Sequence, residues 1–179
     1  MQELIHRPRR LRSSATMRDL VAEARLDPRM LVQPHFVVPG AGISEPIVAM
    51  PGIDHQSVDR LVATVGRDLE LGIRACLLFG VPDESVKAPD GSGAAADDNL
   101  VSQAVAALKD AFGDALLVMT DVCLCAYTDH GHCGIVEDGR ILNDPSIEIL
   151  GKVAVSHARA GADMVDINMG CPVKKVVNV

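Results

Sequence analysis

The sequence predicts an α/β fold, a partial TIM (β/α)8 barrel made of about the first four βα units and preceded by an N-terminal arm. Strand-like apolar segments begin near residues 31, 75, 116 and 163, and segments with helical spacing of apolar residues separate them. The chain has 179 residues, whereas a closed barrel takes about 250. The polar and glycine-bearing loops follow the carboxyl ends of the strands, where barrel enzymes carry their chemistry. We therefore expect about half a barrel.

Two parts are expected, an arm with a short helix over residues 1–30 and the partial barrel over residues 31–179. The arm contains the basic segment Arg7–Arg12, which shows no apolar periodicity. Thr16–Asp19 resembles a capping box, so a short helix should start there and end before Pro28.

The first half of the barrel part should hold two strands and one helix. Residues 31–38 form an apolar strand that Pro34 should interrupt, and residues 39–54 form a long loop. A helix should start after Ser57 and close at Gly72, before a second strand at residues 75–79.

The second half repeats the alternation of strand and helix. After a loop rich in small residues, we expect a helix at 101–112, a strand at 115–122, a helix from Asp144 to Gly161 and a strand at 163–168. A doubly wound open sheet is the alternative architecture, although no Gly-x-Gly-x-x-Gly turn indicates a dinucleotide site.

The composition is typical of a soluble globular protein. Apolar residues make up 48% of the chain and its formal net charge is −7, which argues against a nucleic-acid-binding surface. No apolar run approaches the roughly 20 residues of a membrane-spanning helix. Residues 1–12 contain no apolar core of a secretory signal. We therefore expect a reducing, cytoplasmic location and no membrane partner.

The segment Asp121–Gly134, which reads DVCLCAYTDHGHCG, carries the most informative pattern. Cys123 and Cys125 are two residues apart at a strand end and so project to the same side, and the loop containing Gly131 can return Cys133 to them. Three thiolates suit zinc and leave a fourth tetrahedral position open, as in catalytic sites.

Other interpretations of this segment remain open. Two of the cysteines could form a disulfide, or all of them could be ordinary small thiols. His130 and His132 could be ligands, or they could orient a ligand or bind substrate.

The same segment resembles the zinc-site signature of the porphobilinogen synthase family, also called delta-aminolevulinic acid dehydratase, in its cysteine-rich form. The resemblance covers about residues 7–165. Further matching segments occur in the family's order: Arg7–Arg12, Leu31–Gly40, Met50–Gly52, Leu78–Pro82 and Ala154–Val165.

The resemblance implies a zinc lyase that condenses two molecules of 5-aminolevulinate to porphobilinogen in tetrapyrrole (heme) biosynthesis. Cys123, Cys125 and Cys133 would hold the metal, and Asp121 would be an active-site carboxylate near the substrate amine, although a role in orienting the loop is the plain alternative. It also implies a homo-oligomer, assembled through the N-terminal arm; exposed barrel edges would add to such association.

Members of this family activate their substrates as Schiff bases on two lysines. The lysines of this chain match neither of those positions, so we expect a truncated chain that is inactive by itself; they are Lys87, Lys109, Lys152, Lys174 and Lys175.

Residues 166–178 resemble a different family, the tRNA-dihydrouridine synthases, so the sequence predicts a change of family near residues 163–166. Under this alternative FMN is the cofactor, Cys171 the acid, Asn168 a neighbour of the flavin or base, and Lys174 a contact to phosphate or RNA. A third interpretation is a non-catalytic zinc-binding assembly module.

Overall fold

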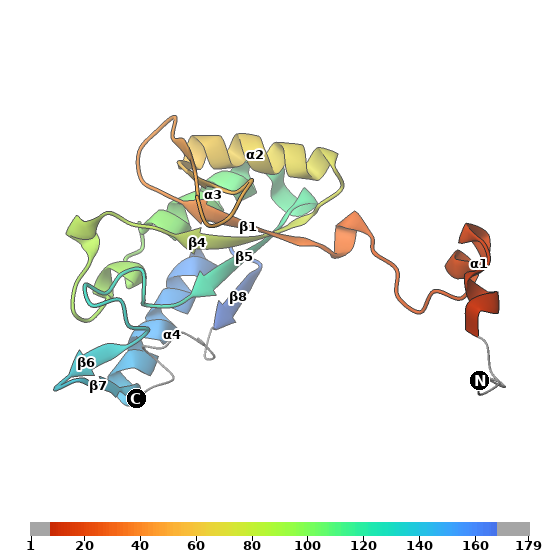
Figure 1. Cartoon of the computed structure of the whole chain (residues 1–179). Coiled ribbons are helices and arrows are strands. Elements are labelled where there is room, and N and C mark those ends of the chain that lie inside the picture. Colours follow the sequence, from red (N-terminus) through yellow and green to blue (C-terminus); the bar gives the residue numbers. More distant parts are fainter. Residues whose placement is uncertain (1–7, 168–179) are drawn as a thin grey trace, which may run out of the picture.

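The computed structural model describes residues 8–167, which contain a six-stranded sheet in the order β2-β3-β1-β4-β5-β8 (Figure 1). All neighbours pair in parallel except β2, which runs antiparallel to β3. The strands are β1 (Val32–Val37), β2 (Ser44–Pro46), β3 (Asp54–Gln56), β4 (Ala75–Gly80), β5 (Leu117–Val122) and β8 (Met164–Ile167).

Four α-helices and a separate hairpin complete the described part. The hairpin pairs β6 (Ile135–Glu137) with β7 (Arg140–Leu142). The α-helices are α1 (Ala15–Leu20), α2 (Val58–Glu70), α3 (Leu100–Phe112) and α4 (Asn143–Arg159). The 3-10 segments are η1 (Pro8–Arg12), η2 (Pro28–Met30), η3 (Glu84–Val86), η4 (Ser92–Ala95) and η5 (Gly113–Ala115). None of these helices combines the length and apolar character needed to cross a bilayer.

The helices cover one face of the sheet. His35, Leu78 and Thr120 lie in register on β1, β4 and β5, and all are buried. α2 packs on β1 and β3, α3 on the centre of the sheet, and α4 on β5 and β8. A doubly wound sheet carries helices on both faces, so the alternative architecture is wrong and the parallel α/β prediction is confirmed.

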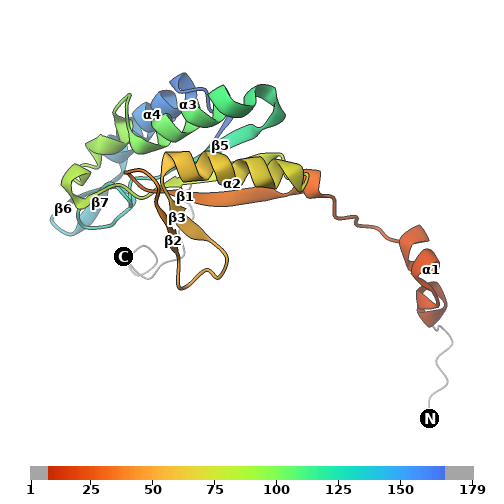
Figure 2. The same cartoon turned by 90° about the horizontal axis from the view of Figure 1, so that it is seen from above.

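The opposite face of the sheet is partly open. Pro34, Leu77, Met119 and Met164 form a row across four strands, and each is intermediate in burial or exposed. On the amino-terminal side of β1, η1 and α1 extend away from the sheet (Figures 1 and 2).

The predicted strands and helices of the barrel part are present, with three corrections. The stretch 39–54 is not simply a loop, because β2 and the start of β3 lie in it. Pro34 does not interrupt β1, since β3 pairs only with Phe36 and Val37 and leaves that side of Pro34 without a neighbouring strand. α4 begins at Asn143, so Asp144 stands inside its first turn.

The short N-terminal helix also starts earlier than predicted. Ser14, rather than Thr16, is the N-cap of α1, and its hydroxyl accepts a hydrogen bond from the Met17 N–H at 3.0 Å.

His157 connects α4 to the buried side of β5. Its Nδ1 lies 3.1 Å from the Thr120 hydroxyl, and both side chains are buried. Burial lowers the pKa of His157 to about 4. His157 is therefore a hydrogen-bonded core residue of the fold.

We expect His157 to make the fold sensitive to acid. In the unfolded chain this histidine becomes protonated below about pH 6.5, whereas in the folded chain it becomes protonated only near pH 4. The unfolded state therefore binds more protons between these pH values, and the free energy of unfolding decreases as the pH falls from about 6.5 to about 4. The variant His157→Gln keeps a hydrogen-bonding group but cannot be protonated. Between about pH 7 and pH 4.5 its free energy of unfolding should decrease by about 2 to 3 kcal/mol less than that of the unchanged chain. Urea unfolding followed by circular dichroism measures this, and equal pH dependence of the two proteins would contradict it.

Candidate metal site

The cysteine cluster begins where β5 ends. β5 lies between β4 and β8, and its last residue, Val122, is fully buried. Cys123 follows directly, at the carboxyl edge of the parallel strands. Leu124, also fully buried, anchors the start of the loop in a small apolar cluster with Tyr127 and Val153.

Local hydrogen bonds turn the loop back on itself. The N–H groups of Tyr127 and Thr128 both donate to the Leu124 carbonyl, at 2.9 and 3.0 Å. The Thr128 hydroxyl then donates to the His132 carbonyl at 2.8 Å, which closes the turn. Gly134 lets the chain pass close to α4, because a Cβ there would lie 2.7 Å from the Ser146 hydroxyl. These contacts place Cys133 beside the strand end.

The loop brings together the three cysteines that the spacing predicted. The sulfur atoms of Cys123, Cys125 and Cys133 all lie within 4.8 Å of one another, and among the described residues this is the group that could hold a metal ion. The Cys123 and Cys125 sulfurs are 3.4 Å apart, whereas a disulfide bond measures about 2.05 Å. The cysteines are not joined as a disulfide.

The thiols compete for one negative charge. The hydrogen bond with Cys125 lowers the pKa of Cys123, and the same contact, together with burial, raises the pKa of Cys125. One thiol therefore loses its proton readily, and its negative charge opposes deprotonation of the neighbouring thiol. Three thiolates at these separations require a nearby cation.

Asp121 precedes the cluster on β5 and pairs in register with Asp166 on β8. Partial burial raises its pKa to about 7, and the charges of Cys123 and Asp166 add to the effect. The carboxyl group can thus exchange a proton near neutral pH, the property expected of a general acid or base.

The two histidines of the loop do not belong to the sulfur cluster. His130 Nε2 lies 3.1 Å from the Pro89 carbonyl oxygen, and its Nδ1 accepts a hydrogen bond from the His132 N–H at 3.1 Å. These two contacts hold His130 against its own loop and against the segment at Pro89.

A cavity of about 220 Å³ adjoins the cluster. Asp121, Cys123 and Cys125 border it together with Phe36 and Phe79, whose rings stack at 5.2 Å. The sequence did not identify the two phenylalanines as site residues, because they read as ordinary strand residues. Their one available signal was position, since both lie near the carboxyl end of a predicted strand.

A fourth cysteine of the described residues, Cys76, lies apart from this cluster. Cys76 is buried within β4, and burial raises the pKa of its thiol to about 12, which matches an inert core cysteine. Asn168, Cys171, Lys174 and Lys175 lie outside the described residues.

Comparison with known proteins identifies related sequences. A family model described as delta-aminolevulinic acid dehydratase matches residues 5–169. The enzyme of that name from Synechococcus elongatus is 45% identical over 164 residues, which cover 89% of this chain and 49% of the relative. The one from Bacillus subtilis is 44% identical over 165 residues, covering 92% of this chain and 50% of the relative.

A solved structure agrees with these matches. Delta-aminolevulinic acid dehydratase from Toxoplasma gondii, in complex with its reaction product porphobilinogen, superposes with a TM-score of 0.87 at 38% identity. The match covers 92% of this chain and 47% of that one. The chain spans about half the length of the curated relatives it matches.

These matches do not favour the dihydrouridine synthase alternative. The family match includes residues 166–169, the first part of the segment that suggested it. In the structure, Asp166 and Ile167 pair with β5 as part of β8, so the sheet continues through the expected change of family. The sequence match, the solved relative and the position of the cysteine cluster agree, and the chain belongs to the delta-aminolevulinic acid dehydratase (porphobilinogen synthase) family.

Proposed function

We propose that this chain supplies the zinc-binding part of a porphobilinogen synthase, a lyase that condenses two molecules of 5-aminolevulinate in tetrapyrrole (heme) biosynthesis. The observation that carries the proposal is the convergence of Cys123, Cys125 and Cys133 at the carboxyl edge of β5, beside Asp121. Family membership supports the reaction, and the sulfur cluster supports the metal.

The donor set fits zinc. In a tetrahedral site with zinc–sulfur bonds of about 2.3 Å, neighbouring sulfurs lie about 3.8 Å apart. The observed sulfurs, within 4.8 Å of one another and 3.4 Å apart in one pair, need only small movements to reach that spacing. Three thiolates leave one position for a substrate oxygen, which zinc would polarise as a Lewis acid.

The remaining walls of the cavity suit a short, polar carbon chain. Phe36 and Phe79 give it an apolar side that excludes water, while Asp121 provides a carboxyl group. With a pKa of about 7, Asp121 can accept a proton from a substrate ammonium and hold it, or return it. We propose this carboxyl group as the proton carrier of the site.

The lysines of the described part are engaged elsewhere. Lys109 forms an ion pair with Asp163 at 3.0 Å, near the amino end of β8, and Lys87 forms one with Glu84 at 2.6 Å. Lys152 borders a groove on α4. We therefore propose that these three lysines do not supply the Schiff-base amines of the reaction, and Lys174 and Lys175 do not match those positions of the family either.

Assembly follows from the open side of the sheet. Leu117 and Met164, which lie on this side, are 38% and 49% exposed, and apolar side chains of this kind favour a covering layer. We propose that these strands form the first part of a barrel, closed by further strands or by a second copy, and that the N-terminal segment adds contacts between subunits. A cluster of reduced thiols fits a reducing compartment such as the cytoplasm.

Zinc content tests the metal assignment. The purified chain should bind one zinc ion, and Cys125→Ala should lower its zinc content strongly, because two thiolates make a much weaker site. Cys76→Ala is the matched control, since that thiol lies in the core, away from the cluster. Elemental analysis after removal of loosely bound metal gives the answer, and unchanged zinc in Cys125→Ala would refute the ligand set.

Incubation with 5-aminolevulinate and zinc tests the placement of the covalent chemistry. We expect no porphobilinogen, because the described lysines are paired or lie away from the cavity. Borohydride reduction followed by mass spectrometry shows whether any lysine forms a substrate adduct. A reduced adduct on any of the five lysines would contradict this account, and so would product formation; these lysines are Lys87, Lys109, Lys152, Lys174 and Lys175.

A further inference from the structure

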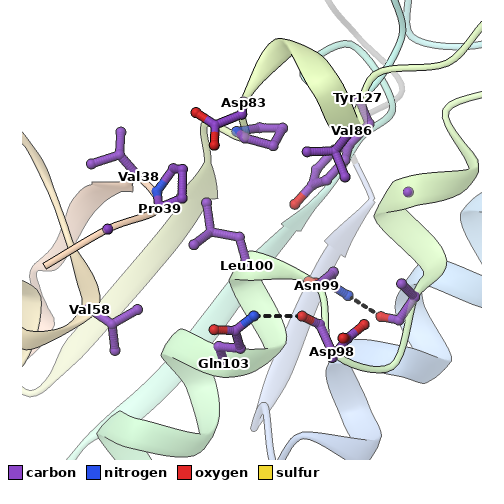
Figure 3. A pocket seen from close by; sticks show the side chains of 14 residues that line it. Val38, Pro39, Val58, Asp83, Val86, Asp98, Asn99, Leu100, Gln103 and Tyr127 are labelled. Carbon is purple, nitrogen blue, oxygen red and sulfur yellow. Dashed lines mark hydrogen bonds between the residues drawn. The ribbon is translucent and has the colours of Figure 1, made fainter.

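A second cavity, of about 330 Å³, shares Tyr127 with the cavity beside the cysteine cluster but is lined by none of the three cysteines. The segments that enclose it follow β1 and β4 and include the first turn of α3 (Figure 3). Its volume lies within the range of small-molecule sites. Neither the proposed metal nor the proposed proton carrier borders it.

The Tyr127 hydroxyl points into this cavity (Figure 3). Tyr127 is only 5% exposed, and its hydroxyl has no hydrogen-bond partner among the described residues. Burial raises the pKa of this phenol to about 12, so the hydroxyl keeps its proton. Buried hydroxyl groups are nearly always hydrogen-bonded, and a ligand that offers an acceptor would satisfy this one.

The rest of the lining combines apolar walls with two carboxylates. Val58, Val86 and Leu100 are among the apolar residues, and no lysine or arginine of residues 8–167 borders the cavity. Asp83 and Asp98 both line it and are exposed. Within residues 8–167, neither carboxylate forms an ion pair or a side-chain hydrogen bond.

An anion is a poorer fit than a cation, although α3 begins at the cavity. The Asn99 side chain already accepts the Ser102 N–H at 2.9 Å, and its carbonyl accepts the Gln103 N–H. Part of the helix terminus is therefore occupied. The two carboxylates of the lining would also repel an anion.

We propose that this cavity binds a small organic cation with an apolar body, whose ammonium group meets Asp83 or Asp98 and whose far end accepts a hydrogen bond from Tyr127. The site is independent of zinc and of the lyase reaction. Because Tyr127 also borders the cysteine cavity, the bound molecule contacts a side chain shared by both sites.

Titration of the full chain with para-methoxybenzylamine, followed by calorimetry or amide chemical shifts, tests the proposal. This probe has an ammonium group, an apolar ring and an ether oxygen as acceptor. It should bind with a stoichiometry of one, while para-methoxybenzoate, with the same body and the opposite charge, should not bind. Asp83→Asn combined with Asp98→Asn should weaken binding about tenfold, and Asp114→Asn, an exposed carboxylate on η5, is the matched control that should leave it unchanged.

Tyr127→Phe separates the hydrogen bond from the shape of the cavity. It should weaken binding of para-methoxybenzylamine about fivefold, the usual effect of one hydrogen bond. Binding of para-methylbenzylamine, which lacks the acceptor, should not change. Failure of the amine to bind, equal binding of the benzoate, or equal effects of Tyr127→Phe on the two amines would each overturn the proposal, and none of these results bears on the zinc assignment.

Discussion

The parallel pairing of β5 with β4 on one side and β8 on the other fixes the positions of Asp121 and of the loop that carries the three cysteines. Because the three strands run in the same direction, their carboxyl ends meet at one edge, and the loop after Val122 must start there. The register with β8 also places Asp166 beside Asp121. In the described part of the chain, the helices that contact the sheet, α2, α3 and α4, lie on one face, so the face that carries Asp121 remains open toward the cavity with Phe36 and Phe79.

Electrostatics explains why such a loop suits a divalent cation. Three sulfurs held this close cannot all lose their protons unaided, as the opposite pKa changes of Cys123 and Cys125 show. A bound cation would remove that conflict, since metal binding and thiol deprotonation are linked. Asp121 shares the constraint, because its raised pKa arises from burial and from its neighbours Cys123 and Asp166. The loop is held by Leu124, Thr128 and Gly134 whether or not the thiols are charged.

Much of this arrangement could be predicted from the sequence, and the limits have physical causes. The alternation of strands and helices is carried by apolar periodicity, and the spacing of Cys123 and Cys125 follows from the two-residue repeat of a strand. The short strands β2, β3, β6 and β7 have only three residues each, too few to show a period. The prediction for Pro34 was wrong because a proline is tolerated in a strand where no neighbouring strand needs its N–H group. The pairing with β3 begins only at Phe36, and the sequence of β1 by itself does not show where that pairing begins. The roles of Phe36, Phe79 and Tyr127 depend on contacts between distant segments, so no local pattern announces them.

The central claim is that this chain forms a three-sulfur zinc site with one position open. X-ray absorption at the zinc edge of the metal-loaded chain measures the ligand shell directly. The account predicts about three sulfur ligands at about 2.3 Å and one lighter ligand at about 2.0 Å, the shell of a site with an open position. A shell dominated by nitrogen, as binding by His130 and His132 would give, or one with four sulfurs, would contradict it.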